Sequence, residues 1–471
     1  MTNPLPRPSG QGHPQRSGSG RSALALPLLV VAALVAHPLL PGDGASRSLA
    51  AQVPSIDPQI MEMVDAVSEE NLERLVEMLA SFETRNTLSS TDDPERGIGA
   101  ARQWMLEEMQ SYSPRLQVSF DSYRIPPQGR IVNEVDLRNV MAILPGRSAR
   151  RVYVGGHYDS VARRELGDTT PEGSFDNFAP GANDDGSGTA LAMELARVMA
   201  QSGIEFDATL VFIGFAGEEQ GLVGARLHAQ RARDNGWTIE ALLSNDIVGN
   251  VYGGAGLIDG STVRVFSEGP EDSPSRHLAR YIKRAASVYV PSQRVRLIAR
   301  EDRFGRGGDH TAFNQVGFTA TRMTEARENY DRQHTIRDTP DGVHVPYLAT
   351  NTRVNLAAMA SLALAPSAPD VNNEQGNPRL SRQLSGYDAR LQWEPSPGAV
   401  SYRVYWRDAW GPDWEYVVEV GDVTDFIMQD VSIDDFIFGV SAVGPGGHES
   451  MVTPYVRPPR ADVEIEELPG N

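Results

Sequence analysis

Residues 209–225 read TLVFIGFAGEEQGLVGA, and this stretch decides the fold class. The run from Leu210 to Phe215 is β-branched and aromatic and is closed by Gly217, which is typical of a buried strand in a sheet covered on both faces. Glu218 and Glu219 follow directly. Neighbouring carboxylates at such a strand end are unfavourable unless a proton or a cation neutralises them. Taken alone, the pair also fits the first turn of a solvated helix, where acids are favoured.

The length, charge and cysteine content of the chain limit its function. With 471 residues it is too long for one ordinary domain, so we expect two folded units and tails. The formal net charge of -19 argues against electrostatic binding to nucleic acid or to an anionic membrane surface. The sequence contains no cysteine, which excludes disulfides, thiolate metal ligands and a cysteine nucleophile. Any metal must therefore be held by His, Asp and Glu.

Residues 1–51 have the three parts of a secretory signal peptide. Arg16 and Arg21 precede an apolar run from Ala23 to Leu40, and the small-residue stretch from Ser48 to Ala51 follows it. The apolar run is interrupted by prolines and is short for a membrane span. We therefore expect a secreted or periplasmic protein that has no membrane attachment after signal cleavage. An uncleaved N-terminal anchor is the competing interpretation.

Strand and helix patterns alternate through residues 53–365. Apolar residues at helical spacing or in short runs predict helices at 56–80 (two), 97–111, 189–201, 222–232, 276–286 and 351–364, and strands at 139–144, 151–155, 210–215, 241–250 and 317–323. The alternation predicts an α/β fold with a mixed, mostly parallel central sheet flanked by helices. In such folds ligands bind beyond the carboxyl ends of the strands.

Histidine and acidic side chains recur at these predicted strand ends and in the loops. They are His157, Asp159, Asp184, Asp185, Glu218, Glu219, Asp246, Asp309, His310, His334 and Asp338. Their nitrogen and oxygen donors suit Zn²⁺, and the set is large enough for two ions. Asp184 and Asp185 also fit a helix N-cap, and Asp246 also fits a turn. The sequence has neither an HExxH helix nor a GxSxG elbow, so a single-metal zincin and a serine hydrolase are not supported.

Six of the motifs resemble those of the M28 di-zinc aminopeptidases, in the order and spacing of that family. They are GGHYDS, GANDDGSG, FAGEEQGLVGA, SNDIVGN, GDHTAF and QHTIRDT. The resemblance implies a zinc exopeptidase fold that binds two Zn²⁺ ions per chain. It places His157 and Asp246 on one zinc. It places Glu219 and His334 on the other, with Asp184 bridging the two ions and often followed by a cis peptide bond.

The same resemblance implies roles for the other polar residues. Glu218 would be the general base and acid. Asp159 would orient His157 by accepting the proton of its free ring nitrogen, and Asp338 would do the same for His334. The remaining candidates would contact the metal ligands or line the substrate pocket: Asp185, Asp309 and His310. His310 also fits a structural histidine whose hydrogen bonds are satisfied.

We predict from this an exported metallopeptidase that removes N-terminal residues from peptides or proteins. A carboxypeptidase of the same superfamily would need a basic pocket, for which the candidates are Arg303, Arg306, Arg322 and Arg327. A single-zinc transferase resembling glutaminyl cyclases fits less well with five zinc ligands. A non-catalytic peptide-binding or adhesion protein on a peptidase scaffold is the alternative from another class. Some relatives shape the pocket loop with a disulfide, so residues 301–308 must be held otherwise here.

A second unit follows residue 365, where the composition changes to Pro, Ser, Asn and Gln and marks a linker over residues 366–376. Short alternating runs then predict a β-sandwich over residues 377–458. Its LQW, SYRVYWR and FGVSAVGPGGHES elements resemble a fibronectin type III domain, with Trp393 and Tyr402 in the core. A contact with a surface or polymer is a further hypothesis for this domain. Residues 459–471 are acidic and are expected to form a disordered tail.

Overall fold

The computed structural model describes residues 56–163 and 175–457. The predicted signal peptide and the predicted acidic tail lie outside these residues. In the part of the chain that is described, no helix is both long and apolar enough to cross a membrane.

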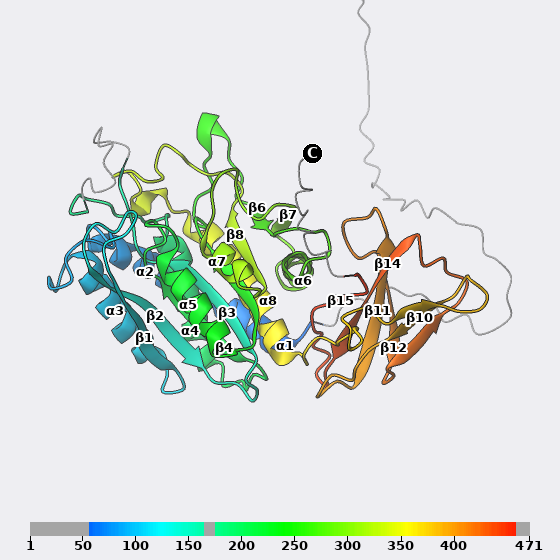
Figure 1. The fold of residues 1–471 in the computed structure, drawn as a ribbon. Helices are drawn as coiled ribbons and strands as arrows, with labels where there is room; N and C mark the ends of the chain where they lie inside the picture. The colour runs from blue at the N-terminus through cyan, green and yellow to red at the C-terminus, as the bar shows by residue number, and fades with distance from the viewer. Residues whose placement is uncertain (1–55, 164–174, 458–471) are drawn as a thin grey trace, which may run out of the picture. The chain divides into compact units, whose positions relative to one another are not determined.

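An eight-stranded mixed sheet forms the centre of the first part of the chain (Figure 1), in the order β1-β2-β4-β3-β5-β8-β6-β7. The strands are β1 (Gln117–Ile125), β2 (Val135–Leu144), β3 (Arg151–His157), β4 (Thr209–Phe215), β5 (Ile239–Asn245), β6 (Thr262–Phe266), β7 (Arg294–Ile298) and β8 (Ala320–Glu325). The four central strands β4, β3, β5 and β8 run parallel to one another. Three pairings are antiparallel, namely β1 with β2, β2 with β4 and β6 with β8. The predicted mixed, mostly parallel sheet is confirmed.

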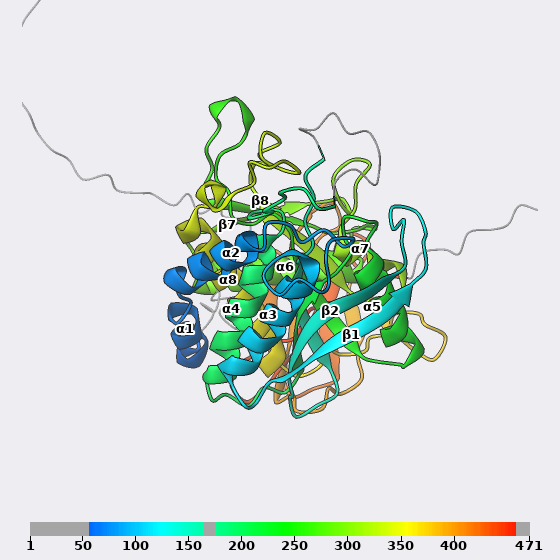
Figure 2. The ribbon, with the colours of Figure 1, turned by 90° about the vertical axis from the view of Figure 1, so that its left-hand side faces the viewer.

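Helices cover both faces of this sheet. They are α1 (Pro58–Asp65), α2 (Glu69–Ser81), α3 (Gly97–Tyr112), α4 (Gly186–Gln201), α5 (Val223–Asp234), α6 (Pro274–Tyr289), α7 (Asp309–Gln315) and α8 (Val345–Leu364), with short 3₁₀ turns η1 (Gly254–Gly256) and η2 (Pro340–Gly342). Figure 2 shows α3 and α4 on one side of β1 and β2, and α5 on the other. The larger hydrophobic core lies under α1 to α4, α6 and α8, and a smaller core lies under α5 and α7.

Strand β4 (Thr209–Phe215) is buried on both faces. Leu210 and Phe212 belong to the larger core, whereas Val211 and Ile213 belong to the smaller one. This is the period of two that a strand imposes on its side chains. The strand therefore has no polar face, and the first acids it can carry come after its end.

The pairing register brings the ends of three parallel strands to one level. His157, the last residue of β3, lies opposite Phe215, the last residue of β4. Gly155 lies opposite Ser244 of β5, and the chain reaches His157 and Asp246 two residues later on either strand. Side chains at these strand ends are consequently neighbours, as parallel sheets require.

The C-terminal part contains two antiparallel sheets that share one core. Their strand orders are β13-β10-β9 and β12-β11-β14-β15. The strands are β9 (Leu380–Arg382), β10 (Ala389–Gln392), β11 (Ser401–Asp408), β12 (Tyr416–Gly421), β13 (Asp425–Met428), β14 (Phe436–Val443) and β15 (Thr453–Pro454). Trp393 and Tyr402 are buried in this core and pack against each other, as predicted. The assignment of the sandwich to the fibronectin type III fold stays a prediction.

Polar contacts join the sandwich to α6. Arg407 of β11 is buried, and its Nη2 lies 2.7 Å from Oδ1 of Asp272, just before the helix. The ring of His277 stacks on that of Trp414. Tyr281 donates a hydrogen bond of 3.0 Å to the backbone carbonyl of Glu449. The sandwich thus contacts α6, one of the helices that cover the eight-stranded sheet.

Candidate metal centre

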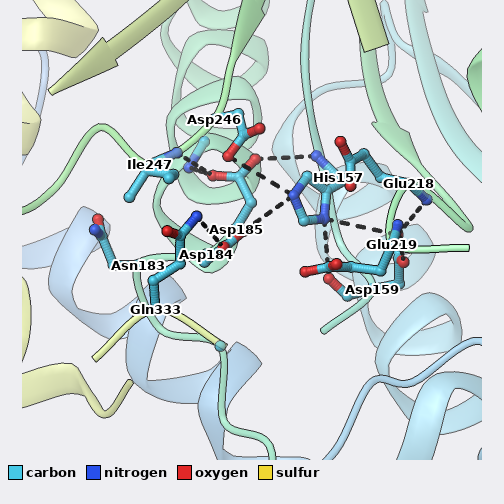
Figure 3. A network of polar contacts seen from close by, with 12 residues as sticks. His157, Asp159, Asn183, Asp184, Asp185, Glu218, Glu219, Asp246, Ile247 and Gln333 are labelled. Atoms are coloured by element: carbon cyan, nitrogen blue, oxygen red, sulfur yellow. Dashed lines mark hydrogen bonds and ion pairs between the residues drawn. The ribbon is translucent and has the colours of Figure 1, made fainter. Parts of the chain in front are cut away.

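The candidate residues meet at the carboxyl ends of β3, β4 and β5 (Figure 3). His157 ends β3, Glu218 and Glu219 follow β4, and Asp246 follows β5. The other members come from the N-terminus of α4, where Asp184 and Asp185 lie, and from the loop after β8, which carries His334. All of the predicted ligand residues are thus brought together.

Asp184 lies between the two histidines. Its Oδ1 is 3.2 Å from Nε2 of His157, and its Oδ2 is 3.0 Å from Nε2 of His334. Gln333 donates a hydrogen bond of 3.0 Å to Oδ2. One carboxylate therefore presents an oxygen to each histidine, which is the arrangement a bridging ligand needs. The Asp184–Asp185 peptide bond is cis, as the resemblance implied.

The donor atoms fall into two groups, each with its atoms within 4.8 Å of one another: His157, Asp185 and Asp246, and Asp184, Glu219 and His334. The oxygens of Asp185, however, accept hydrogen bonds from the backbone amides of His157, Gly188 and Ile247. Asp185 thereby ties β3, α4 and the end of β5 together. Asp184 is the carboxylate better placed to complete the first group.

Glu219 is the residue whose surroundings fit a cation most clearly. Its buried Oε1 lies 2.9 Å from Nε2 of His334 yet accepts no hydrogen bond from the described residues. Buried polar atoms without a partner are rare in native structures. Two groups of nitrogen and carboxylate donors, with such an atom in one of them, fit Zn²⁺ ions.

The pKa values of two side chains in the centre are shifted from their ordinary values. Burial raises the pKa of the Glu218 carboxyl well above its usual value, and the nearby carboxylates of Glu219 and Asp246 raise it further. Burial lowers the pKa of His334, but Glu219 and Asp184 more than offset this and raise it to about 10. Such shifts arise where several like charges share a site, and a cation relieves them.

Glu218 and Glu219 are separated in role by their surroundings. Gly217, with φ of 72°, turns the chain after β4, so that both glutamate amides point at Asp159. The Oδ1 of Asp159 accepts from Glu218 N and Oδ2 from Glu219 N, each at 3.1 Å. Glu219 directs its carboxylate at His334, whereas the half-buried Glu218 has no place in either donor group.

The contacts of Asp159 and Asp338 differ from those expected. Nδ1 of His157 bonds to the backbone oxygen of Asp159 at 3.0 Å, while the carboxylate is 3.7 Å away and accepts the glutamate amides. Asp338 accepts from the amides of Asn183 and Asp184 at 3.0 and 2.9 Å. Its carboxylate thus holds the bridging residue in place. Burial raises the pKa of Asp338 to about 7.

His310 and Asp309 open α7 and are buried. Nε2 of His310 donates to the carbonyl of Glu301 at 2.8 Å and lies 3.7 Å from Asp302, so this histidine holds the loop between β7 and α7. Burial raises the pKa of Asp309 to about 8. Nδ1 of His310 and Oδ1 of Asp309 are buried and have no hydrogen-bond partner among the described residues, so His310 is only partly satisfied.

Two arginines contact the outer oxygens of metal-ligand candidates: Arg163, which the sequence did not single out, and Arg322, which was expected only as part of a basic substrate pocket. Nη2 of Arg322 forms an ion pair with Oδ2 of Asp246 at 2.9 Å. Nη2 of Arg163 donates to Oε2 of Glu219 at 3.3 Å. Each carboxylate therefore has one oxygen held by a guanidinium and the other free to face its donor group.

Arg85 is another residue that the sequence did not reveal. It is fully buried and donates hydrogen bonds to four carbonyls, at distances of 2.6 to 2.8 Å, those of Leu79, Tyr158, Pro180 and Gly181. It ties the chain after β3 to the loop that leads into Asp184. A lone arginine after a helix carries no sequence signal for this role.

Comparisons with known proteins agree with this geometry. A family model described as Peptidase family M28 matches residues 139–359. A "probable zinc metalloprotease" of Pyrenophora teres f. teres (strain 0-1) is 37% identical over 431 residues, which cover 84% of this chain and 86% of that protein.

Solved structures share the fold. The aminopeptidase LapA of Legionella pneumophila superposes with a TM-score of 0.51 at 20% identity, covering 66% of this chain and 77% of its own. A glutaminyl cyclase of Macrostomum lignano superposes with a TM-score of 0.51 at 17% identity, covering 65% and 93%. At these identities the two structures show the common fold alone. The level of identity and coverage with the Pyrenophora protein, together with the family match, shows that the chain belongs to peptidase family M28.

Proposed function

We propose that the protein is a di-zinc aminopeptidase. The observation that carries the proposal is the position of Asp184, whose two oxygens face His157 and His334 separately. Each histidine has its own further carboxylate, Asp246 on one side and Glu219 on the other. Two complete donor groups joined by one carboxylate favour a pair of ions over a single one.

The proposed ligands are His157 and Asp246 for one zinc, Glu219 and His334 for the other, and Asp184 for both. When bound, the zinc ions would acidify a water molecule and polarise the carbonyl of the scissile peptide bond. Glu218, which is adjacent but outside the donor groups, would take the proton from that water and pass it to the leaving amine. Burial raises the pKa of its carboxyl above the ordinary value.

The charges around the centre favour a substrate's N-terminus over its C-terminus. Two of the four arginines considered for a carboxypeptidase pocket are already committed: Arg322 to Asp246 and Asp302, and Arg303 to Asp302 and Glu328. The fold shared with LapA accords with aminopeptidase activity. Because a glutaminyl cyclase shares this fold as well, the fold does not distinguish the two activities, and the metal ligands have to do so. The second complete donor group argues against a single-zinc transferase.

Export is a second part of the proposal. It rests on the signal-like composition of residues 1–51 and predicts that the mature protein begins after the apolar run. N-terminal sequencing of protein recovered outside the cytoplasm tests this.

The activity is tested with purified protein, added zinc and matched peptides that have free, N-acetylated or C-amidated ends. Mass spectrometry then shows which end shortens. We expect stepwise loss of N-terminal residues from free and C-amidated peptides and no cleavage of acetylated ones. Shortening of acetylated peptides from the C-terminus would instead establish a carboxypeptidase, and binding without any shortening would establish a non-catalytic protein.

A further inference from the structure

The loop between β7 and α7, residues 299–308, is held next to the metal centre without a disulfide. Arg322 joins it to the site, because Nη2 contacts Asp246 at 2.9 Å while Nη1 contacts Asp302 at 3.2 Å. His310 supports the loop from behind through the carbonyl of Glu301. The loop therefore has a fixed position relative to Asp246.

Three arginines near this loop share one carboxylate. Glu328 is approached by Arg264 at 2.9 Å, Arg303 at 3.0 Å and Arg306 at 3.7 Å. Arg303 also contacts Asp302 at 3.0 Å. The longest of the three contacts with Glu328 is that of Arg306, for which no closer carboxylate is found among the described residues.

Arg306 is the most exposed of the arginines near this loop that contact these acids. The side chains of Arg264, Arg303 and Arg322 are 18%, 9% and 0% exposed, whereas that of Arg306 is 34% exposed. Its closest carboxylate, that of Glu328, already accepts two shorter contacts. Arg306 therefore has guanidinium donors to spare, and they are accessible from solvent.

Arg306 also lies close to the reacting centre. Arg303 links the two, since its Nη1 is 3.0 Å from Glu328 and its Nη2 is 4.0 Å from Asp246. Burial lowers the pKa of Arg306, but the charges of Asp246, Glu328 and Asp184 outweigh this and raise it. A series of contacts thus leads from Arg306 through Glu328 and Arg303 to Asp246 at the metal centre.

We infer that Arg306 is a specificity-determining residue that binds a carboxylate of the substrate. A planar guanidinium recognises a carboxylate through paired hydrogen bonds, which a neutral amide of the same shape cannot match. The carboxylate is either that of an acidic side chain near the cleaved bond or the C-terminal carboxylate of a short peptide. The inference rests on the proposed peptidase function and specifies its preferred substrates.

Two sets of peptides distinguish these sources. One set pairs Glu with Gln at the residues on either side of the cleaved bond, in peptides with an amidated C-terminus. The other pairs free with amidated C-termini in neutral dipeptides and tripeptides. We expect wild-type kcat/KM to favour the carboxylate member of one set at least about threefold, which is the size of a partly exposed ion pair.

The variants are Arg306→Gln, Arg306→Lys and the matched control Arg300→Gln. Arg300 is an exposed arginine of the same loop whose guanidinium lies over the ring of Phe304. The preference should disappear in Arg306→Gln, persist in part in Arg306→Lys and remain in Arg300→Gln. The set in which it disappears identifies the carboxylate.

Absence of any preference in the wild type, or an unchanged preference in Arg306→Gln, would overturn the inference while leaving the peptidase function intact. If the wild type cleaves no peptide, the peptidase proposal fails separately. Calorimetric binding of the same peptides then decides the role of Arg306, because a lost preference in binding supports it and a retained one overturns it.

Discussion

Arg322 and Asp246 form a buried ion pair, with Nη2 of the arginine 2.9 Å from Oδ2 of the aspartate. The pair fixes the carboxylate so that its other oxygen faces His157. Residues that contact a metal ligand without touching the metal typically contribute about 10- to 100-fold to metal affinity. We therefore predict that Arg322→Met combined with Asp302→Asn, which removes the second partner of Arg322, releases zinc at a roughly 10- to 100-fold lower chelator concentration than wild type.

Asp302→Asn alone is the control, since it keeps the contact of Arg322 with Asp246. It should retain zinc as the wild type does, and circular dichroism should show both proteins folded. Equal zinc retention in the double variant and the wild type would show that the ion pair has no part in metal binding.

Asp159 fixes both glutamates, because its two oxygens accept the amides of Glu218 and Glu219. In Asp159→Asn the amide group offers only one acceptor oxygen and sets a donor against the second amide. An unsatisfied buried amide costs roughly 1–3 kcal/mol. We expect a lower melting temperature and reduced kcat, measured at saturating zinc. An unchanged melting temperature and kcat would contradict the assigned role.

The sequence predicted where three of the candidate ligands lie, because each follows a strong local signal. His157, Glu219 and Asp246 come directly after short apolar strands, so their position at the sheet edge followed from hydrophobic periodicity. Ser68, which directly precedes the acids Glu69 and Glu70, likewise caps α2, and its side chain accepts from Asn71 N at 3.1 Å. Local patterns of this kind survive folding unchanged.

Three strands of the eight-stranded sheet were not predicted, and the reason is physical. β1 and β7 lie at the two edges of the sheet, and β1 exposes much of its length, so it lacks a continuous apolar run. β6 is five residues long and is interrupted by Arg264. Strands of this kind are defined by their partners, which the local sequence does not name.

The sequence also did not predict which groups the charged side chains contact. Arg322 appeared to be a candidate for a substrate pocket, yet it is fully buried against Asp246 and Asp302. The carboxylate of Asp159 was expected on His157 and instead accepts backbone amides, because the turn at Gly217 points them toward it. Such contacts depend on backbone orientation that residue types and spacing do not fix.

His277 makes the contact between α6 and the sandwich sensitive to acid. Burial lowers its pKa to about 3, and the neighbouring charges of Arg280 and Arg407 contribute. Below about pH 6.5 the unfolded chain binds a proton that the folded protein does not, so stability is lost as the pH falls from about 6.5 toward 3. The slope is about 1.4 kcal/mol per pH unit for one proton.

Denaturant unfolding of His277→Gln and wild type between pH 7 and pH 4 measures this contribution. The free energy of unfolding of the variant should fall less steeply with acid than that of the wild type. Parallel curves for the two proteins would show that His277 takes up a proton equally in the folded and unfolded states.

Glu219 is expected to bind zinc, whereas the adjacent Glu218 is expected to transfer protons. Its carboxylate belongs to a donor group, and its Oε1 lies 2.9 Å from Nε2 of His334. Glu219→Ala should therefore lose about one zinc ion per chain by metal analysis after dialysis. A variant that keeps both ions would remove Glu219 from the ligand set.

The most direct test is the zinc content and peptidase activity of Glu218→Ala. Glu218 lies outside both donor groups, so this variant should bind zinc as the wild type does. Its hydrolysis of a peptide with a free N-terminus should fall by about 10²- to 10⁴-fold, because the proton carrier is gone. A zinc-loaded Glu218→Ala protein that hydrolyses the peptide at the wild-type rate would contradict the account.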